Sequence, residues 1–176
     1  MAGHHRQRRV ICPKKDKNLS KALDRFNKAD GVVVYWQIFG TSNVRELKPG
    51  ELLIEKLLYR SANPGPSGLF KSIVKPEGAV CVDPHWTQVP LMLQPDGQRF
   101  SHTPNFETIP VDILSIHHYT YRTESFYQAV KKPRRALWGD IPNFEAEKNR
   151  LDNANAIFDP FMLQFTERLK KRVFKE

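Results

Sequence analysis

Runs of apolar residues predict that strands and helices are mixed along this chain. The run GVVVYWQIFG, residues 31–40, is β-branched and aromatic and lies between two glycines, so it predicts a buried central strand. VDILSIHHY, residues 111–119, alternates in polarity and ends in polar residues, which predicts a strand that delivers side chains to a sheet edge. KSIVK and GAVCV, residues 71–75 and 78–82, predict two shorter strands.

Helices are predicted where apolar residues recur every three or four positions. Residues 18–26 form one short helix, and a second helix starts near residue 123 and is stopped by Pro133. Asp159 is the expected cap of a C-terminal helix. Residues 52–60 fit a helix or a strand, and the proline-rich residues 85–110 predict a long loop with a hairpin at PDGQ. The expected fold class is α/β.

The charge of the chain indicates an anionic partner. The 176 residues carry a formal net charge of +9, which suits a nucleic acid, a membrane surface or a phosphorylated ligand. The sequence lacks the patterns of an RRM, a KH loop or a zinc finger, so nucleic acid is the less favoured partner. The N-terminal segment has no apolar core of a secretory signal, and no apolar run approaches the roughly 18 residues of a transmembrane span, so we expect a cytoplasmic protein.

Several chemical signatures are absent from the sequence. It contains no GxGxxG, no P-loop, no HExxH and no GxSxG. Rossmann dehydrogenases, P-loop enzymes, zincins and α/β-hydrolases therefore lose their usual support.

Five strings occur in a distinctive order along the chain. They are WQIFGTS (36–42), GELLIEKLLYR (50–60), KSIVKPE (71–77), PHW (84–86) and HHYTYRT (117–123) running into FYQAVKKPRR. In this order they resemble the C-terminal half of glycosyltransferase family 92 and its close family 2-like relatives. DNANAIFDP, residues 152–160, resembles the closing segment of that family.

The resemblance implies a GT-A-like fold for nucleotide-diphospho-sugars, with a mostly parallel sheet flanked by helices. It implies transfer of a sugar from a nucleotide sugar, with a UDP-sugar as first choice, to the hydroxyl of a glycan or other acceptor. The resemblance also implies that the transfer inverts the anomeric centre. It also implies a divalent cation, Mn²⁺ or Mg²⁺. Such a transfer needs neutralised charge on the departing diphosphate and a carboxylate that takes the acceptor's proton.

The resemblance assigns the charged residues as follows. His118 is the expected metal ligand, and the alternative is an imidazole bonded to a backbone carbonyl. Arg122 is expected to bind the diphosphate, with a surface salt bridge as the alternative. Lys71 and Lys75 carry the same two interpretations, and Lys71 is preferred because the family string includes it.

Aromatic and hydroxyl side chains complete the substrate site. His85 and Trp86 are expected to line a sugar or acceptor pocket, although Trp86 also fits a core position. Thr41 and Ser42 are expected to hydrogen-bond the substrate, whereas Trp36 is assigned to packing.

The general base has two candidates in this sequence. They are Glu55, in a family-like string, and Asp83, next to PHW. An exposed carboxylate without a catalytic role is the alternative for both.

The front of the sequence departs from the family. Where the family carries an acidic motif resembling D-x-D-E-F, this chain has RQRR at residues 6–9, and arginines do not bind cations. We therefore expect residues 1–9 to be an unrelated or disordered start and residues 10–176 to be one domain, the truncated C-terminal half of the fold. The alternative function is an inactive remnant or a domain that binds nucleotides or glycans without turnover. A truncated fold would also have as a partner another chain that completes it.

Overall fold

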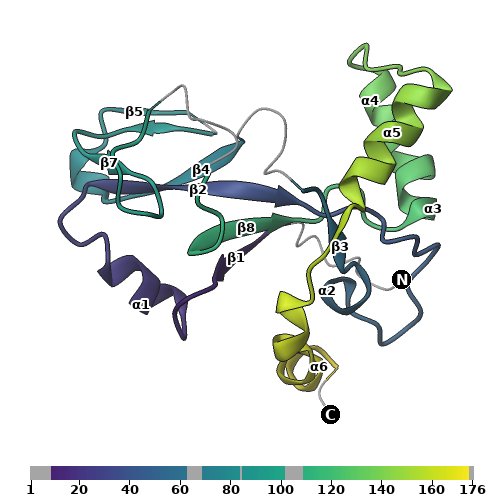
Figure 1. Cartoon of the computed structure of the whole chain (residues 1–176), viewed down its shortest axis with the longest axis horizontal. Coiled ribbons are helices and arrows are strands. Elements are labelled where there is room, and N and C mark those ends of the chain that lie inside the picture. Colours follow the sequence, from purple (N-terminus) through teal and green to yellow (C-terminus); the bar gives the residue numbers. More distant parts are fainter. Residues whose placement is uncertain (1–8, 63–68, 84, 102–108, 175–176) are drawn as a thin grey trace. The chain divides into compact units, whose positions relative to one another are not determined.

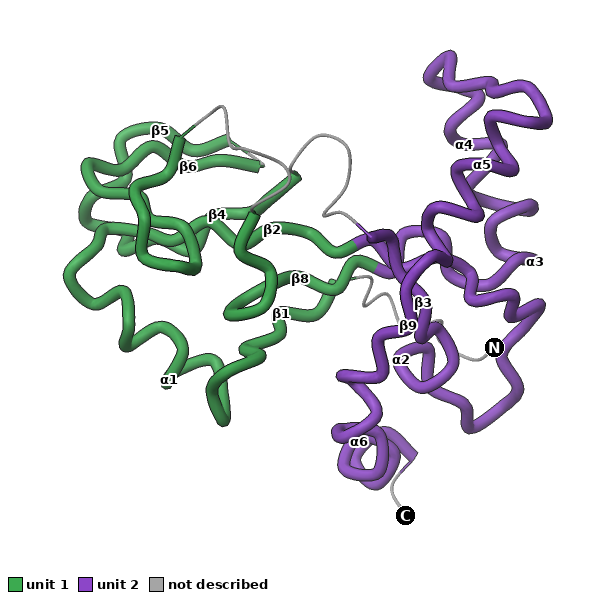
Figure 2. The backbone as a smooth tube through the Cα atoms, viewed as in Figure 1, with its two compact units in different colours: residues 1–37, 63–118 green, residues 38–62, 119–176 purple. Residues whose placement is uncertain are grey.

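The computed structural model describes residues 9–62, 69–83, 85–101 and 109–174. The chain divides into two compact units, unit 1 with Met1–Gln37 and Asn63–His118, and unit 2 with Ile38–Ala62 and Tyr119–Glu176 (Figure 2). The sequence predicted a single domain over residues 10–176, and that stays a prediction. No helix in the described ranges is both long enough and apolar enough to cross a bilayer.

Unit 1 is built on a five-stranded sheet (Figure 1). Its strands are β1 (Arg9–Pro13), β2 (Gly31–Ile38), β4 (Phe70–Val74), β7 (Met92–Leu93) and β8 (Leu114–His118). The order is β1-β8-β2-β4, and β7 also pairs with β2. The predicted strands in residues 31–40 and 111–119 are therefore confirmed as β2 and β8.

The sheet is mixed, so the predicted mostly parallel arrangement is wrong for the described pairs. β1 with β8 and β2 with β4 are antiparallel, and β2 with β7 is parallel. An apolar run reports that a strand is buried but carries no information on its direction, which the connections decide.

Short elements surround this sheet. Helix α1 (Leu19–Asp24) begins after Asn18, whose side chain accepts a hydrogen bond from Lys21 N. The remaining elements of unit 1 are η1 (Pro76–Gly78), β5 (Cys81–Val82) and β6 (Thr87–Gln88). The hairpin predicted at PDGQ is present, since Gly97 N donates to Gln94 O and Leu93 bridges Arg99.

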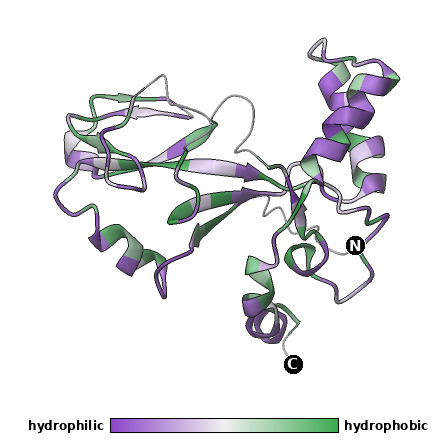
Figure 3. Ribbon diagram, in the orientation of Figure 1, coloured by the Kyte–Doolittle hydropathy of each residue, from purple (hydrophilic) through white to green (hydrophobic). Residues whose placement is uncertain are grey.

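The core of unit 1 forms on one face of β2. Val33, Tyr35, Met92 and Ile109 are buried together, with Phe70 among the side chains packed against them. Figure 3 shows hydrophobic and hydrophilic colouring on the strands of this sheet, and in β2 the three valines precede Gln37. Burial raises the pKa of Tyr35 to about 12.

Unit 2 is mainly helical. Its elements are α2 (Leu53–Lys56), β3 (Tyr59–Arg60), α3 (Glu124–Phe126), η2 (Tyr127–Lys131), α4 (Lys132–Ala136), α5 (Phe144–Ala154), β9 (Ile157–Phe158), η3 (Phe161–Phe165) and α6 (Thr166–Val173). β3 and β9 pair antiparallel. The ambiguous residues 52–60 thus form a helical turn followed by a short strand.

The sequence predicted that the helix beginning after Thr123 stops at Pro133, and this prediction is wrong. The helix passes through the π-helical turn η2 and continues as α4 to Ala136. A proline removes one backbone donor, and a π-turn changes the local hydrogen-bond spacing, so the two features together let the helix continue.

Candidate functional site

Four neighbouring strands of unit 1 each contribute one side chain to a cluster around Trp36. The guanidinium carbon of Arg9 on β1 lies 4.5 Å from the centre of the Trp36 ring, and Lys71 Nζ on β4 lies 5.9 Å from it. The ring of His118 on β8 lies edge-on to Trp36, with centroids 4.4 Å apart. His85, from the loop between β5 and β6, lies 5.4 Å from Trp36. These five residues are the Trp36 cluster.

Strand register explains why these residues meet. Arg9 lies opposite His118 in the β1–β8 pair, and Lys71 lies opposite Val34 in the β2–β4 pair. Trp36 is two residues beyond Val34 and therefore points to the same face of the sheet. The order β1-β8-β2-β4 then places the four side chains across adjacent strands.

The electrostatics of the Trp36 cluster favour an anion. Burial lowers the pKa of Lys71, the positive charge of Arg9 lowers it further, and the negative charge of Asp83 acts in the opposite direction. Trp36 is only 5% exposed, and within the described part of the chain its Nε1 donates no hydrogen bond. A guanidinium and an ammonium are groups that bind phosphate oxygens.

The divalent cation that the resemblance implies stays a prediction. Arg9, the last residue of RQRR, brings a positive charge to the Trp36 cluster beside His118. Within the described ranges, no three His, Cys, Asp or Glu side chains gather into a metal-binding group. The metal-ligand role of His118 stays a prediction, and no chemical step is derived through a cation.

Two of the other predicted residues of unit 1, Lys75 and Asp83, form hydrogen bonds with backbone groups of the same unit. Lys75 Nζ donates to Asn27 O over 2.6 Å, and Asp83 Oδ1 accepts from His85 N over 2.8 Å. Trp86 lines a hollow of about 230 Å³ together with Phe100 and neighbouring residues. Asp83 thus orients the loop that carries His85.

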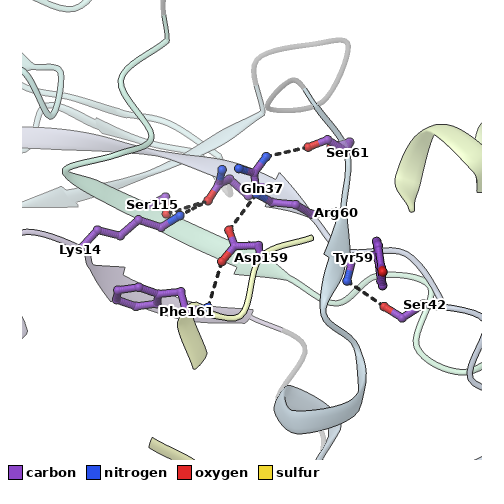
Figure 4. A network of polar contacts seen from close by, with 9 residues as sticks. All are labelled: Lys14, Gln37, Ser42, Tyr59, Arg60, Ser61, Ser115, Asp159 and Phe161. Atoms are coloured by element: carbon purple, nitrogen blue, oxygen red, sulfur yellow. Dashed lines mark hydrogen bonds and ion pairs between the residues drawn. The ribbon is translucent and has the colours of Figure 1, made fainter. Parts of the chain in front are cut away.

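Thr41 and Ser42 belong to unit 2 and are bonded within it. Ser42 N donates to Asn155 Oδ1 over 2.8 Å, and Asn155 Nδ2 donates to Thr41 Oγ1 over 3.4 Å. Ser42 Oγ accepts from Tyr59 N over 2.9 Å (Figure 4). A Cβ added to Gly40 would lie 2.1 Å from Asn155 Oδ1. The strings WQIFGTS and DNANAIFDP therefore meet in unit 2 through structural hydrogen bonds.

A second contact joins another family-like string, GELLIEKLLYR, to DNANAIFDP. Arg60 Nε donates to Asp159 Oδ2 over 2.8 Å, and Asp159 Oδ1 accepts from Phe161 N over 3.1 Å (Figure 4). The side chains of Arg60 and Asp159 are 18% and 8% exposed. Sequence reasoning missed this pair, although Arg60 ends GELLIEKLLYR and Asp159 lies in the closing segment.

A buried amide in unit 1 was also missed by sequence reasoning. Gln37 Oε1 accepts from Lys14 Nζ over 2.7 Å and from Ser115 Oγ over 3.3 Å (Figure 4). Gln37 interrupts the apolar run of β2, and this interruption was the available signal for the contact.

The remaining predicted residues, Glu55 and Arg122, also lie in unit 2. Glu55 Oε2 is 2.8 Å from Lys170 Nζ. Arg122 has a backbone φ of 57°, and its guanidinium carbon lies 4.7 Å from the centre of the Phe126 ring. A groove of about 400 Å³ in unit 2 is lined by Thr41, Asn155 and residues of α5.

Comparisons with known proteins add no relative. No protein-family model, no curated protein and no solved structure matches this chain. The described architecture defines a mixed α/β protein.

Proposed function

We propose that this chain is a glycosyltransferase-like protein, related to family 92 and its GT-A fold. It binds a nucleotide sugar at the Trp36 cluster and transfers the sugar to a hydroxyl acceptor. One observation carries this proposal: family-like strings far apart in the sequence supply Trp36, Lys71, His85 and His118, whose side chains lie around one indole ring.

The chemistry of a leaving nucleoside diphosphate fits this cluster. Negative charge grows on the diphosphate as the bond to the sugar breaks, and fixed positive groups stabilise that charge. Arg9 offers a planar fork of donors and Lys71 offers a compact charge, both beside Trp36. In unit 1, Asp83 is the candidate general base, the carboxylate that would take the proton of the acceptor hydroxyl.

A second candidate function is binding of a nucleotide or glycan without turnover. It is favoured by Arg9, which belongs to the segment that replaces the family's acidic motif. A cluster that keeps its positive groups but loses the acidic residues retains an anion site and loses part of the catalytic machinery.

Release of UDP from a panel of UDP-hexoses separates the two candidates. We expect Asp83→Asn to lower the rate of sugar transfer by about 100-fold or more, because a positioned general base contributes at least this much. Asparagine keeps the Oδ1 that accepts from His85 N, so the loop stays in place. Glu77→Gln, another carboxylate of unit 1 on η1, is the matched control and is expected to leave the rate unchanged.

The wild-type result decides between transfer and binding. Wild-type protein that binds UDP but releases none from any UDP-hexose, with Mn²⁺, Mg²⁺ or EDTA present, would leave only the second candidate. Equal rates for Asp83→Asn and Glu77→Gln would remove Asp83 from the role of general base.

A further inference from the structure

The turn between α4 and α5 displays four large apolar side chains to solvent. Leu137, Trp138, Ile141 and Phe144 are 83%, 70%, 76% and 77% exposed. Single exposed apolar residues are common on protein surfaces, but four within eight positions concentrate apolar surface in one turn, and such a concentration marks an interaction surface. We call residues 137–144 the apolar turn.

The apolar turn is an ordered structure. Asp140 pairs with Arg135 of α4 and with Arg150 of α5, the latter over 3.1 Å, so one carboxylate ties the two helices together. Gly139 has a φ of +77°, which a glycine adopts without strain. Asn143 caps α5 by accepting from Ala146 N over 2.8 Å. These contacts hold the apolar side chains outward in a fixed turn.

The surroundings of the apolar turn are basic. Residues 131–150 contain six Lys and Arg and three Asp and Glu side chains. The guanidinium carbon of Arg134 lies 5.1 Å from the centre of the Trp138 ring. A tryptophan next to basic side chains is the combination that favours the boundary between lipid headgroups and acyl chains.

The position of the turn favours a bilayer over a folded partner. Figure 1 shows the turn at the tip of the α4–α5 pair, at the end away from β3 and β9 of the same unit. A narrow convex tip has little area for a stable protein interface, whereas a bilayer accepts a few inserted side chains without a complementary groove. The net positive charge of residues 131–150 complements anionic headgroups.

We propose that the apolar turn inserts Leu137, Trp138, Ile141 and Phe144 into the surface of an anionic lipid bilayer, while Arg134 of α4, beside Trp138, contacts the headgroups. The protein then lies on the membrane without crossing it. This proposal stands on unit 2 alone and is independent of the Trp36 cluster.

Flotation of the whole chain with lipid vesicles tests this proposal. We expect binding to phosphatidylcholine vesicles that contain phosphatidylserine, and weak binding to pure phosphatidylcholine. The double variant Leu137→Ser/Trp138→Ser is expected to lower the partition coefficient by about tenfold or more, because two apolar side chains no longer leave water. The matched control is Val80→Ser/Val82→Ser, which alters two side chains of 75% and 78% exposure in unit 1.

Three outcomes would overturn the proposal. They are absence of wild-type binding to the anionic vesicles, equal losses in the two double variants, and equal binding to both kinds of vesicle. Sedimentation velocity tests the main alternative, in which a second copy of the chain covers the apolar turn. One further result would assign the apolar turn to a second copy of the chain. The wild-type protein would not bind vesicles but would self-associate, and Leu137→Ser/Trp138→Ser would abolish that self-association.

Discussion

Replacing Asp159 with asparagine is expected to lower the free energy of unfolding by about 3 kcal/mol, because removing one partner of a largely buried ion pair leaves the other charge uncompensated. Arg60, 2.8 Å from Asp159, is only 18% exposed. Asparagine keeps an oxygen for the hydrogen bond from Phe161 N, so the variant isolates the loss of charge. Chemical denaturation followed by circular dichroism measures the change.

The control for this variant is Asp112→Asn. Asp112 pairs with Lys15 over 3.0 Å, and these side chains are 68% and 54% exposed. Solvent weakens such a pair, so we expect a loss below about 1 kcal/mol. Similar losses in the two variants would show that the Arg60–Asp159 pair does not hold β3 to the closing segment.

Gly40→Ala is expected to lower the free energy of unfolding by about 2–3 kcal/mol, because the added methyl group overpacks a filled site. Its Cβ would lie 2.1 Å from Asn155 Oδ1 and 2.7 Å from Ala154 O, and the second of these atoms belongs to backbone. Moving Asn155 would also disturb its hydrogen bond from Ser42 N.

Gly78→Ala provides the comparison for Gly40→Ala. The nearest atoms to a Cβ at Gly78 lie 3.6 Å away, which is ordinary contact. We expect the free energy of unfolding of this control to lie within about 0.5 kcal/mol of that of the wild type, as it does for most unconstrained surface substitutions. A Gly40→Ala protein as stable as the control would mean that the contact between residues 40 and 155 is looser than described.

The buried strands could be predicted from sequence, because burial leaves a direct mark on composition. The continuous apolar run of β2 and the polar end of β8 indicated both strands. Strand direction could not be predicted, since the same apolar residues suit parallel and antiparallel neighbours. The predicted helix end at Pro133 was wrong because the effect of a proline depends on the preceding turn. A helix continues through the proline when that turn can change its hydrogen bonding, as η2 does.

The candidate site was predicted in part. His118, Lys71 and His85 were expected in a site, and the structure places all three around Trp36, which the sequence assigned to packing. Arg9 entered the sequence argument only as a departure from the family. Its position depends on the register with His118, and a sequence does not reveal register between strands so far apart.

In unit 2, residues that were expected in a substrate site have partners within the chain instead. Thr41, Ser42 and Glu55 were expected to act on substrate, and the structure gives each a partner within the chain, either Asn155 or Lys170. Residues in a family-like string can be required for packing as well as for chemistry, and a string alone does not separate these causes.

Calorimetric titration of UDP into the purified chain tests the central claim, that the Trp36 cluster is a nucleotide-sugar site. We expect UDP to bind, and Lys71→Ala to weaken binding by about tenfold, because a charge-assisted hydrogen bond is lost. Lys75→Ala removes the same charge from a residue that donates to Asn27 O and is expected to leave binding unchanged. Tighter binding with Mn²⁺ that is lost in His118→Ala would support His118 as a metal ligand. Folded protein that binds no UDP with or without Mn²⁺, or equal losses in Lys71→Ala and Lys75→Ala, would contradict the claim.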